Sequence, residues 1–202
     1  MRILVAAVSL LLLSQELPPP FPRAGTTLML ENERVRVWNI AWLKQAYPQH
    51  RHPYDMTGVY YATGDRIIIS PEGERRASHT EAWNITFQRT GLTHAEEGAS
   101  DDPLRSVFIE MKQASGGSVA GSGEVPFPTS GATQRLDNDR VTVWELTPAA
   151  AASSVGHRHL REAVVVWFDA AGAPQARYVE RGAVDGSDAP PAATRAFVFE
   201  IK

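Results

Sequence analysis

The sequence predicts an all-β protein that is built from two copies of one unit. Residues 30–38 and 136–144 share the pattern Leu-acid-Asn-acid-Arg-Val-x-Val-Trp, and a His-Arg-His triplet follows each at 50–52 and 157–159. The copies also close alike, with residues 105–112 matched by 195–202. Self-similarity on this scale indicates repeated structural units, so we interpret the chain as an internal duplication.

Short alternating segments support the β assignment. Residues 34–40 and 140–146 alternate charged or polar with apolar side chains, which is the period of a half-buried strand. Further β-rich runs lie at 58–61, 66–69, 84–87, 106–111, 163–168 and 177–180, with turn residues every eight to twelve positions or so. Many short strands at that spacing favour a sandwich or barrel. No convincing amphipathic helix follows residue 15.

Composition narrows the classes of function. With 202 residues and a net charge of −3, the chain gives no electrostatic reason to expect a nucleic acid or an anionic membrane as partner. It contains no cysteine, which excludes disulfides, thiolate metal sites and a cysteine nucleophile. Any metal must therefore be held by nitrogen and oxygen ligands.

Four segments organise the chain. Residues 1–15 have one positive charge, an apolar run and a polar exit, which predicts an export signal and an extracytoplasmic protein (periplasmic or secreted) without a stable membrane anchor after signal removal. The alternative is an apolar N-terminal strand. Residues 16–115 form the first domain, 116–131 a Gly/Ser/Pro-rich linker and 132–202 the second domain. We expect 182–193 to be a surface loop.

His50 and His52 are the candidate metal ligands. Residues i and i+2 of a strand point to the same face, so both imidazoles can face one barrel interior, and His94 can supply a third. Imidazole suits Fe, Zn, Cu, Ni and, less selectively, Mn, and the sequence does not distinguish among them. The alternative is that the pair marks two polar residues on an exposed face.

The first copy resembles the cupin superfamily. The resemblance rests on His50-x-His52, then Gly64, then Gly91-x-x-His94 before a final strand, and it is closest to small bacterial single-domain cupins. Two such units in one chain resemble a bicupin. This resemblance implies a duplicated double-stranded β-helix, or jelly-roll barrel, in which two histidines and a glutamate of one motif and a histidine of a second motif hold a divalent metal.

The chain departs from that pattern at several positions. The glutamate position falls on Met56 or Thr57, so Asp55 is the candidate fourth ligand, although its strand parity is opposite unless Pro53 bends the chain. In the second motif three residues are unusual: Trp83 replaces a glycine, Arg89 a proline and Gly98 an asparagine.

Two residues are candidates for binding a substrate. Arg89, if it points inward, can bind a carboxylate through a bidentate contact. Tyr60 is a candidate for the pocket mouth, together with Tyr54, Trp83 and Phe87, although aromatic residues at alternating strand positions are more often core.

The second copy is shortened and degenerate. Glu162 occupies the position equivalent to Asp55, and no histidine follows His159. Between the motif glycine and the final strand, the second copy has 22 residues where the first has 40. We therefore interpret His157 and His159 as a vestigial pair or a weak surface metal site, in a domain that packs against the first.

Three functions fit these observations. The first is an exported cupin that binds a divalent metal and a small organic ligand, with or without catalysis. The second is a three-histidine iron dioxygenase, which resembles the thiol-dioxygenase branch of the cupins; an isomerase is the other enzymatic alternative. The third is a metal-free binding or structural module. Edge strands of such barrels often pair between subunits, which would give a homodimer.

Overall fold

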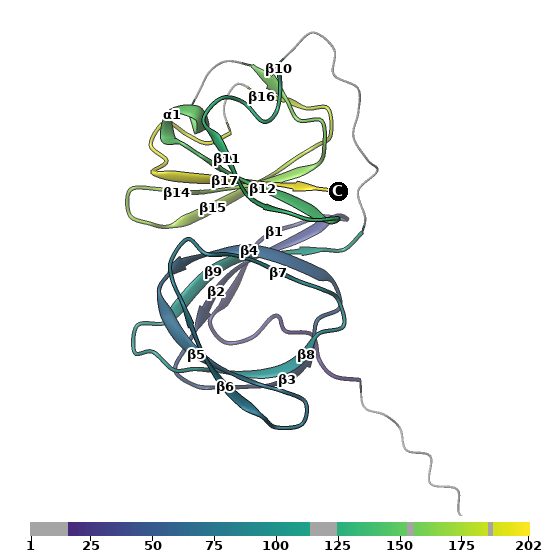
Figure 1. Cartoon of the computed structure of the whole chain (residues 1–202), viewed down its shortest axis with the longest axis vertical. Helices are drawn as coiled ribbons and strands as arrows, with labels where there is room; N and C mark the ends of the chain where they lie inside the picture. The colour runs from purple at the N-terminus through teal and green to yellow at the C-terminus, as the bar shows by residue number, and fades with distance from the viewer. Residues whose placement is uncertain (1–15, 114–124, 153–155, 186–187) are drawn as a thin grey trace, which may run out of the picture.

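The computed structural model describes residues 16–113, 125–152, 156–185 and 188–202. They form two β lobes stacked along the long axis of the molecule, with the N-terminal lobe below in Figure 1. The predicted all-β, duplicated fold is confirmed. The predicted export signal lies outside the described residues, and no helix within them is long and apolar enough to cross a membrane.

The N-terminal lobe is a barrel made of two sheets. One sheet has the order β1 (Thr26–Glu31), β2 (Val35–Trp42), β9 (Leu104–Met111), β4 (Asp55–Ala62) and β7 (Ile85–Gln88). The other has the order β3 (Ala46–Arg51), β8 (Thr93–Gly98), β5 (Gly64–Ile69) and β6 (Arg75–Thr80). All pairings in both sheets are antiparallel.

The C-terminal lobe repeats the first sheet and reduces the second. The order β11 (Ala132–Asp137), β12 (Val141–Leu146), β17 (Arg195–Ile201), β14 (Ala163–Phe168) and β15 (Pro174–Val179) matches β1-β2-β9-β4-β7. Three two-residue strands make the other sheet: β10 (Val125–Pro126), β13 (His157–Arg158) and β16 (Val184–Asp185). The predicted shortening of the second copy is therefore confirmed.

Two local elements differ from the sequence prediction. Strand β10 and the buried Phe127 belong to the C-terminal lobe, so this lobe includes part of the stretch assigned to the linker. A four-residue helix, α1 (Pro148–Ala151), follows Thr147, whose side chain accepts a hydrogen bond from the Ala150 backbone N–H. Threonine before proline is a good start for a helix, but one turn is too short to produce an amphipathic pattern.

The two five-stranded sheets pack against each other and share the largest apolar core. On β2, Val35 and Val37 face the other lobe, whereas Trp38 and Ile40 on the alternate positions face the interior of their own barrel. This parity follows from the period of two in a strand. The shared core contains buried residues of both lobes: Val35, Val37, Val59, Val107, Ile109, Met111, Val141, Val143, Val164, Val166, Phe168, Phe197, Phe199 and Ile201.

Equivalent ion pairs cross between the lobes in opposite directions. Arg140 Nε of the second copy donates to Asp55 Oδ2 of the first at 2.6 Å, and Arg34 Nε of the first donates to Glu162 Oε2 of the second at 2.8 Å. Arg34 and Arg140 are equivalent in the duplicated pattern, as are Asp55 and Glu162. The lobes are therefore paired as in a two-fold symmetric dimer, in which each contact occurs twice.

Candidate metal centre

The three predicted histidines meet inside the N-terminal barrel. His50 lies on β3 directly opposite His94 on β8, and His52 follows the end of β3. The backbone holds His52 in register, because its N–H donates to Leu92 and its carbonyl accepts from Gly91. Gly91 has φ of +84°, a conformation that favours glycine, which accounts for the glycine three residues before His94.

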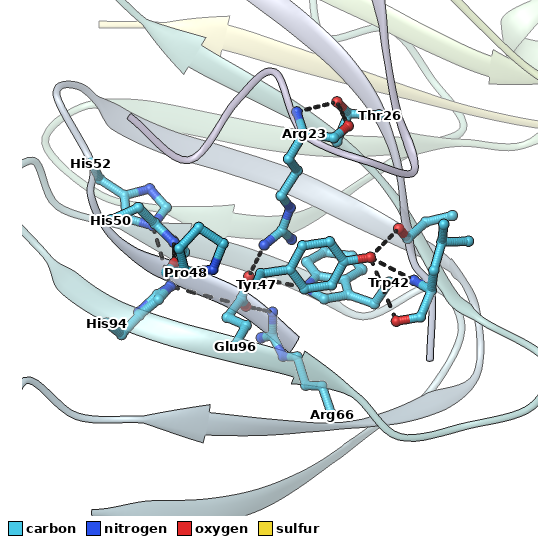
Figure 2. A network of polar contacts seen from close by, with 12 residues as sticks. Arg23, Thr26, Trp42, Tyr47, Pro48, His50, His52, Arg66, His94 and Glu96 are labelled. Atoms are coloured by element: carbon cyan, nitrogen blue, oxygen red, sulfur yellow. Dashed lines mark hydrogen bonds and ion pairs between the residues drawn. The ribbon is translucent and has the colours of Figure 1, made fainter. Parts of the chain in front are cut away.

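The imidazoles form a compact, buried cluster. The ring centroids of His50 lie 5.2 Å from His52 and 4.6 Å from His94, and the Nε2 atoms of His52 and His94 are 3.4 Å apart. One ring nitrogen from each residue lies within 4.8 Å of the other two. All three side chains are buried, and Figure 2 shows their rings gathered at one place in the barrel. The alternative of two histidines on an exposed face is therefore wrong.

The surroundings prepare these rings to bind a cation. Burial lowers the pKa of His52 to about 3 and that of His94 to about 4, and it also lowers the pKa of His50, so the rings are neutral at pH 7. His50 Nδ1 lies 3.0 Å from the Pro48 carbonyl, which can only accept, so the proton is on Nδ1. His50 Nε2 is buried without a hydrogen-bond partner among the described residues. This leaves its lone pair for a metal, the usual arrangement of a histidine ligand.

A charged network lies directly behind the histidines. Glu96, two positions after His94 on the same face of β8, accepts hydrogen bonds from Arg66 Nη1 at 2.8 Å and Trp42 Nε1 at 3.0 Å. Arg23 Nη1 lies 2.9 Å from Glu96 Oε2, and its guanidinium stacks over the Tyr47 ring at 4.0 Å. In Figure 2 Arg23 reaches this network from the segment before β1.

The arginines hold Glu96 as a carboxylate. Burial alone would raise the pKa of Glu96, but Arg23, Arg66 and the neighbouring His94 together lower it to about 2. Its Oε1 remains 4.0 Å from His94 Nε2. Glu96 therefore contributes negative charge beside the histidines while its oxygens are bound by the arginines and Trp42.

A cavity of about 530 Å³ opens beside His52. Arg36 and Arg51 bring two positive charges to its wall, and Glu16 brings one negative charge. The remaining lining comes from the N-terminal segment and the motif loops: Leu17, Pro19, Pro53, Tyr54, Thr90 and Gly91. Of the three histidines, His52 is the one that lines this cavity.

Asp55 lies away from the histidine cluster and has other partners. Its Oδ1 accepts the Thr90 N–H at 2.8 Å, and its Oδ2 accepts Arg140 Nε at 2.6 Å. Met56, the next residue, faces the barrel interior. Asp55 therefore points to the opposite face, as its position in the strand predicts. The structure assigns Asp55 to the contact between the lobes instead of to the metal cluster.

The two candidate substrate residues also lie elsewhere. Arg89 points to the other lobe, where Nη2 donates to Asp139 at 2.5 Å, so it does not face the barrel interior. Tyr60 is 2% exposed in the apolar core, and its hydroxyl accepts from Arg66 Nη2 at 2.9 Å. Neither Arg89 nor Tyr60 is among the residues that line the cavity beside His52.

The histidines of the second copy form a second cluster. His157 and His159 are fully buried, which excludes a surface site, and both contact Asp188. Asp188 lies in the stretch 182–193 that the sequence predicts to be a surface loop, yet it is 1% exposed. The sequence contains no motif that indicates Asp188, whereas the i+2 spacing from His94 would have indicated Glu96.

Comparisons with known proteins identify the fold. No family model and no curated protein match the chain. Among solved structures, the chain is similar to AerE from Microcystis aeruginosa, with 11% identity, a TM-score of 0.55 and coverage of 94% of this chain and 100% of that chain. A cupin domain from Bordetella pertussis Tohama I has 26% identity and a TM-score of 0.41, covering 48% of this chain and 98% of that chain.

A further solved structure spans both lobes. A Cupin 2 conserved barrel domain protein from Leptotrichia buccalis has 12% identity and a TM-score of 0.45, with 88% of each chain covered. AerE aligns to nearly all of this chain, so the two proteins share one fold over both lobes. The chain has the fold of the cupin superfamily in duplicated form, which confirms the predicted resemblance.

Proposed function

We propose that this protein is an exported metal-binding cupin, which holds one divalent transition metal on His50, His52 and His94 and binds a small acidic molecule beside it. The convergence of three buried, neutral imidazoles supports this proposal above all. Such a nitrogen donor set suits Zn, Fe, Cu or Ni and leaves coordination positions for water or a ligand. The bound ion would supply a Lewis acid, or a redox centre if it is iron or copper.

Charge in the cavity supports an acidic ligand. Arg36 comes from the barrel-facing side of β2 and Arg51 from the end of β3, so two cations from different strands line the space that His52 also lines. Arg36 is paired with Glu31 at 2.6 Å, whereas Arg51 is an exposed side chain. A guanidinium binds a carboxylate through paired hydrogen bonds, so Arg51 is the side chain that we expect to bind the acid.

A ligand screen on metal-loaded protein tests this part of the proposal. Small mono- and dicarboxylates are added, and binding is measured by calorimetry with wild type, Arg51→Met and the exposed control Arg76→Met on β6. We expect Arg51→Met to weaken binding by about 10-fold or more, equivalent to a charge-assisted hydrogen bond, and Arg76→Met to leave it unchanged. Equal binding by Arg51→Met and wild type would contradict the assignment.

A second candidate function is an iron-dependent dioxygenase. It is favoured by a donor set of three neutral histidines, because the nearby carboxylate of Glu96 is bound by Arg66 and Trp42. Oxygen uptake by iron-loaded protein with small thiol acids tests this function. Uptake that requires both iron and His50 would support it, and uptake equal to that of His50→Ala would exclude it for those substrates.

Export is supported by the charge and apolar pattern of residues 1–15. Expression of the full chain in a Gram-negative host, followed by fractionation and N-terminal sequencing, tests this prediction. We expect the protein in the periplasm or medium with a new N-terminus near residue 15. Full-length protein in the cytoplasm would contradict export.

A further inference from the structure

The C-terminal lobe contains a second set of converging donor atoms, in a different arrangement from the first. His157 Nε2 and His159 Nε2 lie 3.2 Å apart, and Asp188 Oδ1 lies 3.3 Å from the first and 3.0 Å from the second. The three side chains are between 0% and 1% exposed. Two imidazoles and one carboxylate oxygen therefore point at one spot inside the lobe.

These separations match those of ligands around one ion. Divalent transition metals bind histidine nitrogen and carboxylate oxygen at about 2.0–2.2 Å. Three such ligands on one face of an octahedron or a tetrahedron lie roughly 2.8–3.6 Å apart, by simple geometry from those bond lengths. The observed edges of 3.0, 3.2 and 3.3 Å fall within this range without movement of any side chain.

The second oxygen of Asp188 is an independent sign of a missing partner. Asp188 Oδ2 is buried and has no hydrogen-bond partner among the residues that the structure describes. A buried carboxylate oxygen without a partner is costly, and such an atom in a native protein requires an explanation such as an ion. A cation beside Oδ1 would neutralise this charge.

The site also lies in the part of the lobe where the strands are only two residues long. His157 is on β13, a strand of two residues, and His159 stacks on Phe127 with ring centroids 4.9 Å apart. Asp188 follows β16, another two-residue strand that pairs with β13. An ion bound by all three ligands would join β13 to Asp188, which follows β16. In the N-terminal lobe, the equivalent side of the barrel is held by the four-stranded sheet β3-β8-β5-β6.

We propose that His157, His159 and Asp188 form a second, structural metal site for a borderline divalent cation such as Zn²⁺. Its third ligand is an aspartate from a loop instead of a histidine from a strand, so the two lobes have different donor sets. Two imidazoles favour Zn²⁺, Co²⁺ or Fe²⁺ over Ca²⁺ and Mg²⁺, which prefer all-oxygen sites. This site is separate from the His50 cluster, and either can exist without the other.

Cobalt titration of a variant that lacks the first site tests the proposal. In the full chain carrying His50→Ala and His52→Ala, Co²⁺ binding is followed by visible absorption and by the melting temperature. We expect one equivalent of bound Co²⁺ and a higher melting temperature. Adding Asp188→Asn should weaken binding by about 100-fold or more, because even outer-shell partners of a metal typically contribute about 10- to 100-fold.

Glu180→Gln is the matched control, since it removes one negative charge from an exposed position of the same lobe. It should leave Co²⁺ binding unchanged. Absence of binding in the folded double-alanine variant, or equal affinity after Asp188→Asn, would overturn the proposal. If Asp188→Asn does not fold, X-ray absorption of the double-alanine variant decides: two imidazoles around cobalt support the site, and fewer overturn it.

The converse variant separates this proposal from the first site. Asp188→Asn with intact His50, His52 and His94 should still bind one equivalent of metal. If the site of His157, His159 and Asp188 does not exist, this variant still binds that equivalent. If the site of His50, His52 and His94 does not exist, this variant binds no metal, and binding by the double-alanine variant is unaffected.

Discussion

Replacement of Asp55 by alanine should destabilise the protein without removing metal from the histidine cluster. The Asp55 and Arg140 side chains are only 9% and 18% exposed, and their contact joins the two lobes. Loss of one partner of a buried pair costs about 3–5 kcal/mol, whereas an exposed pair contributes about 0–1 kcal/mol. The low exposure places this pair near the buried limit, and Asp55 also binds the Thr90 N–H.

We therefore expect Asp55→Ala to lower the free energy of unfolding by about 3 kcal/mol. For a protein of this size that corresponds to a decrease in melting temperature of about 6–12 °C. Asp55→Asn keeps an oxygen for Thr90 but removes the charge, so its effect should be smaller. Glu162→Ala breaks the equivalent contact with Arg34, whose side chain is 22% exposed, and should also destabilise less.

Thermal unfolding of metal-free protein measures the stability, and elemental analysis of reloaded protein measures the metal. Metal-free samples are needed because bound metal would itself raise the melting temperature. Unchanged stability of the metal-free variant together with loss of metal would refute the structural role and make Asp55 a ligand. Loss of stability with full metal content would support the geometry described above.

Two other variants test packing and electrostatics. Trp83 has φ of +69° and its ring contacts Phe168 and Phe197 of the other lobe, so Trp83→Ala should cost about 3 kcal/mol in urea unfolding. Trp83→Gly should cost up to about 1 kcal/mol less, because glycine adopts positive φ without strain; a greater cost for glycine would contradict this. Burial raises the pKa of Glu110, which accepts a hydrogen bond from Trp38 Nε1 at 2.9 Å. The contribution of Glu110 to the free energy of unfolding is therefore complete below its ordinary pKa of 4.5 and declines as the pH rises through the raised pKa. Glu110→Gln should flatten that decline in urea unfolding. The same pH dependence in the variant and in wild type would exclude this role of Glu110.

The sequence predicts much of the fold because the duplication is local and regular. Alternation at 34–40 and 140–146 reflects strands with one face in the shared core and one in a barrel, and both appear as β2 and β12. The His-x-His spacing predicts two inward imidazoles for the same reason, and Gly91 with His94 completes the cluster. Each of these features depends only on strand parity or on a glycine conformation.

The rest of the candidate site depends on distant parts of the chain. Asp188 lies in residues 188–194, which have no regular secondary structure, so no period in the sequence indicates that its side chain points to the His157 pair. Arg23 enters the barrel from the segment before β1, and neither alternation nor a motif precedes it. Arg89 and Asp55 each form an ion pair with a residue of the other lobe. Such contacts depend on how the two copies are placed relative to each other.

Trp83 illustrates how the duplication changes a familiar position. In the cupin motif that this segment resembles, a glycine is usual at the position of Trp83. Trp83 nevertheless has a positive φ, a conformation that favours glycine. The indole instead packs against Phe168 and stacks under the Arg195 guanidinium, 4.4 Å from the ring centroid. Packing with the second lobe offsets the backbone strain, so the departure from the motif reflects the interface and not the metal cluster.

The metal content of the first site is the most direct test of this account. Untagged protein is reloaded with Zn²⁺ or Fe²⁺ and analysed beside a His50→Ala, His52→Ala variant. A His79→Ala variant is the control, because His79 is exposed and pairs with Asp65. We predict that the double variant loses one equivalent of metal relative to wild type and that His79→Ala loses none. Equal metal in wild type and the folded double variant would contradict the assignment of His50, His52 and His94 as a metal centre.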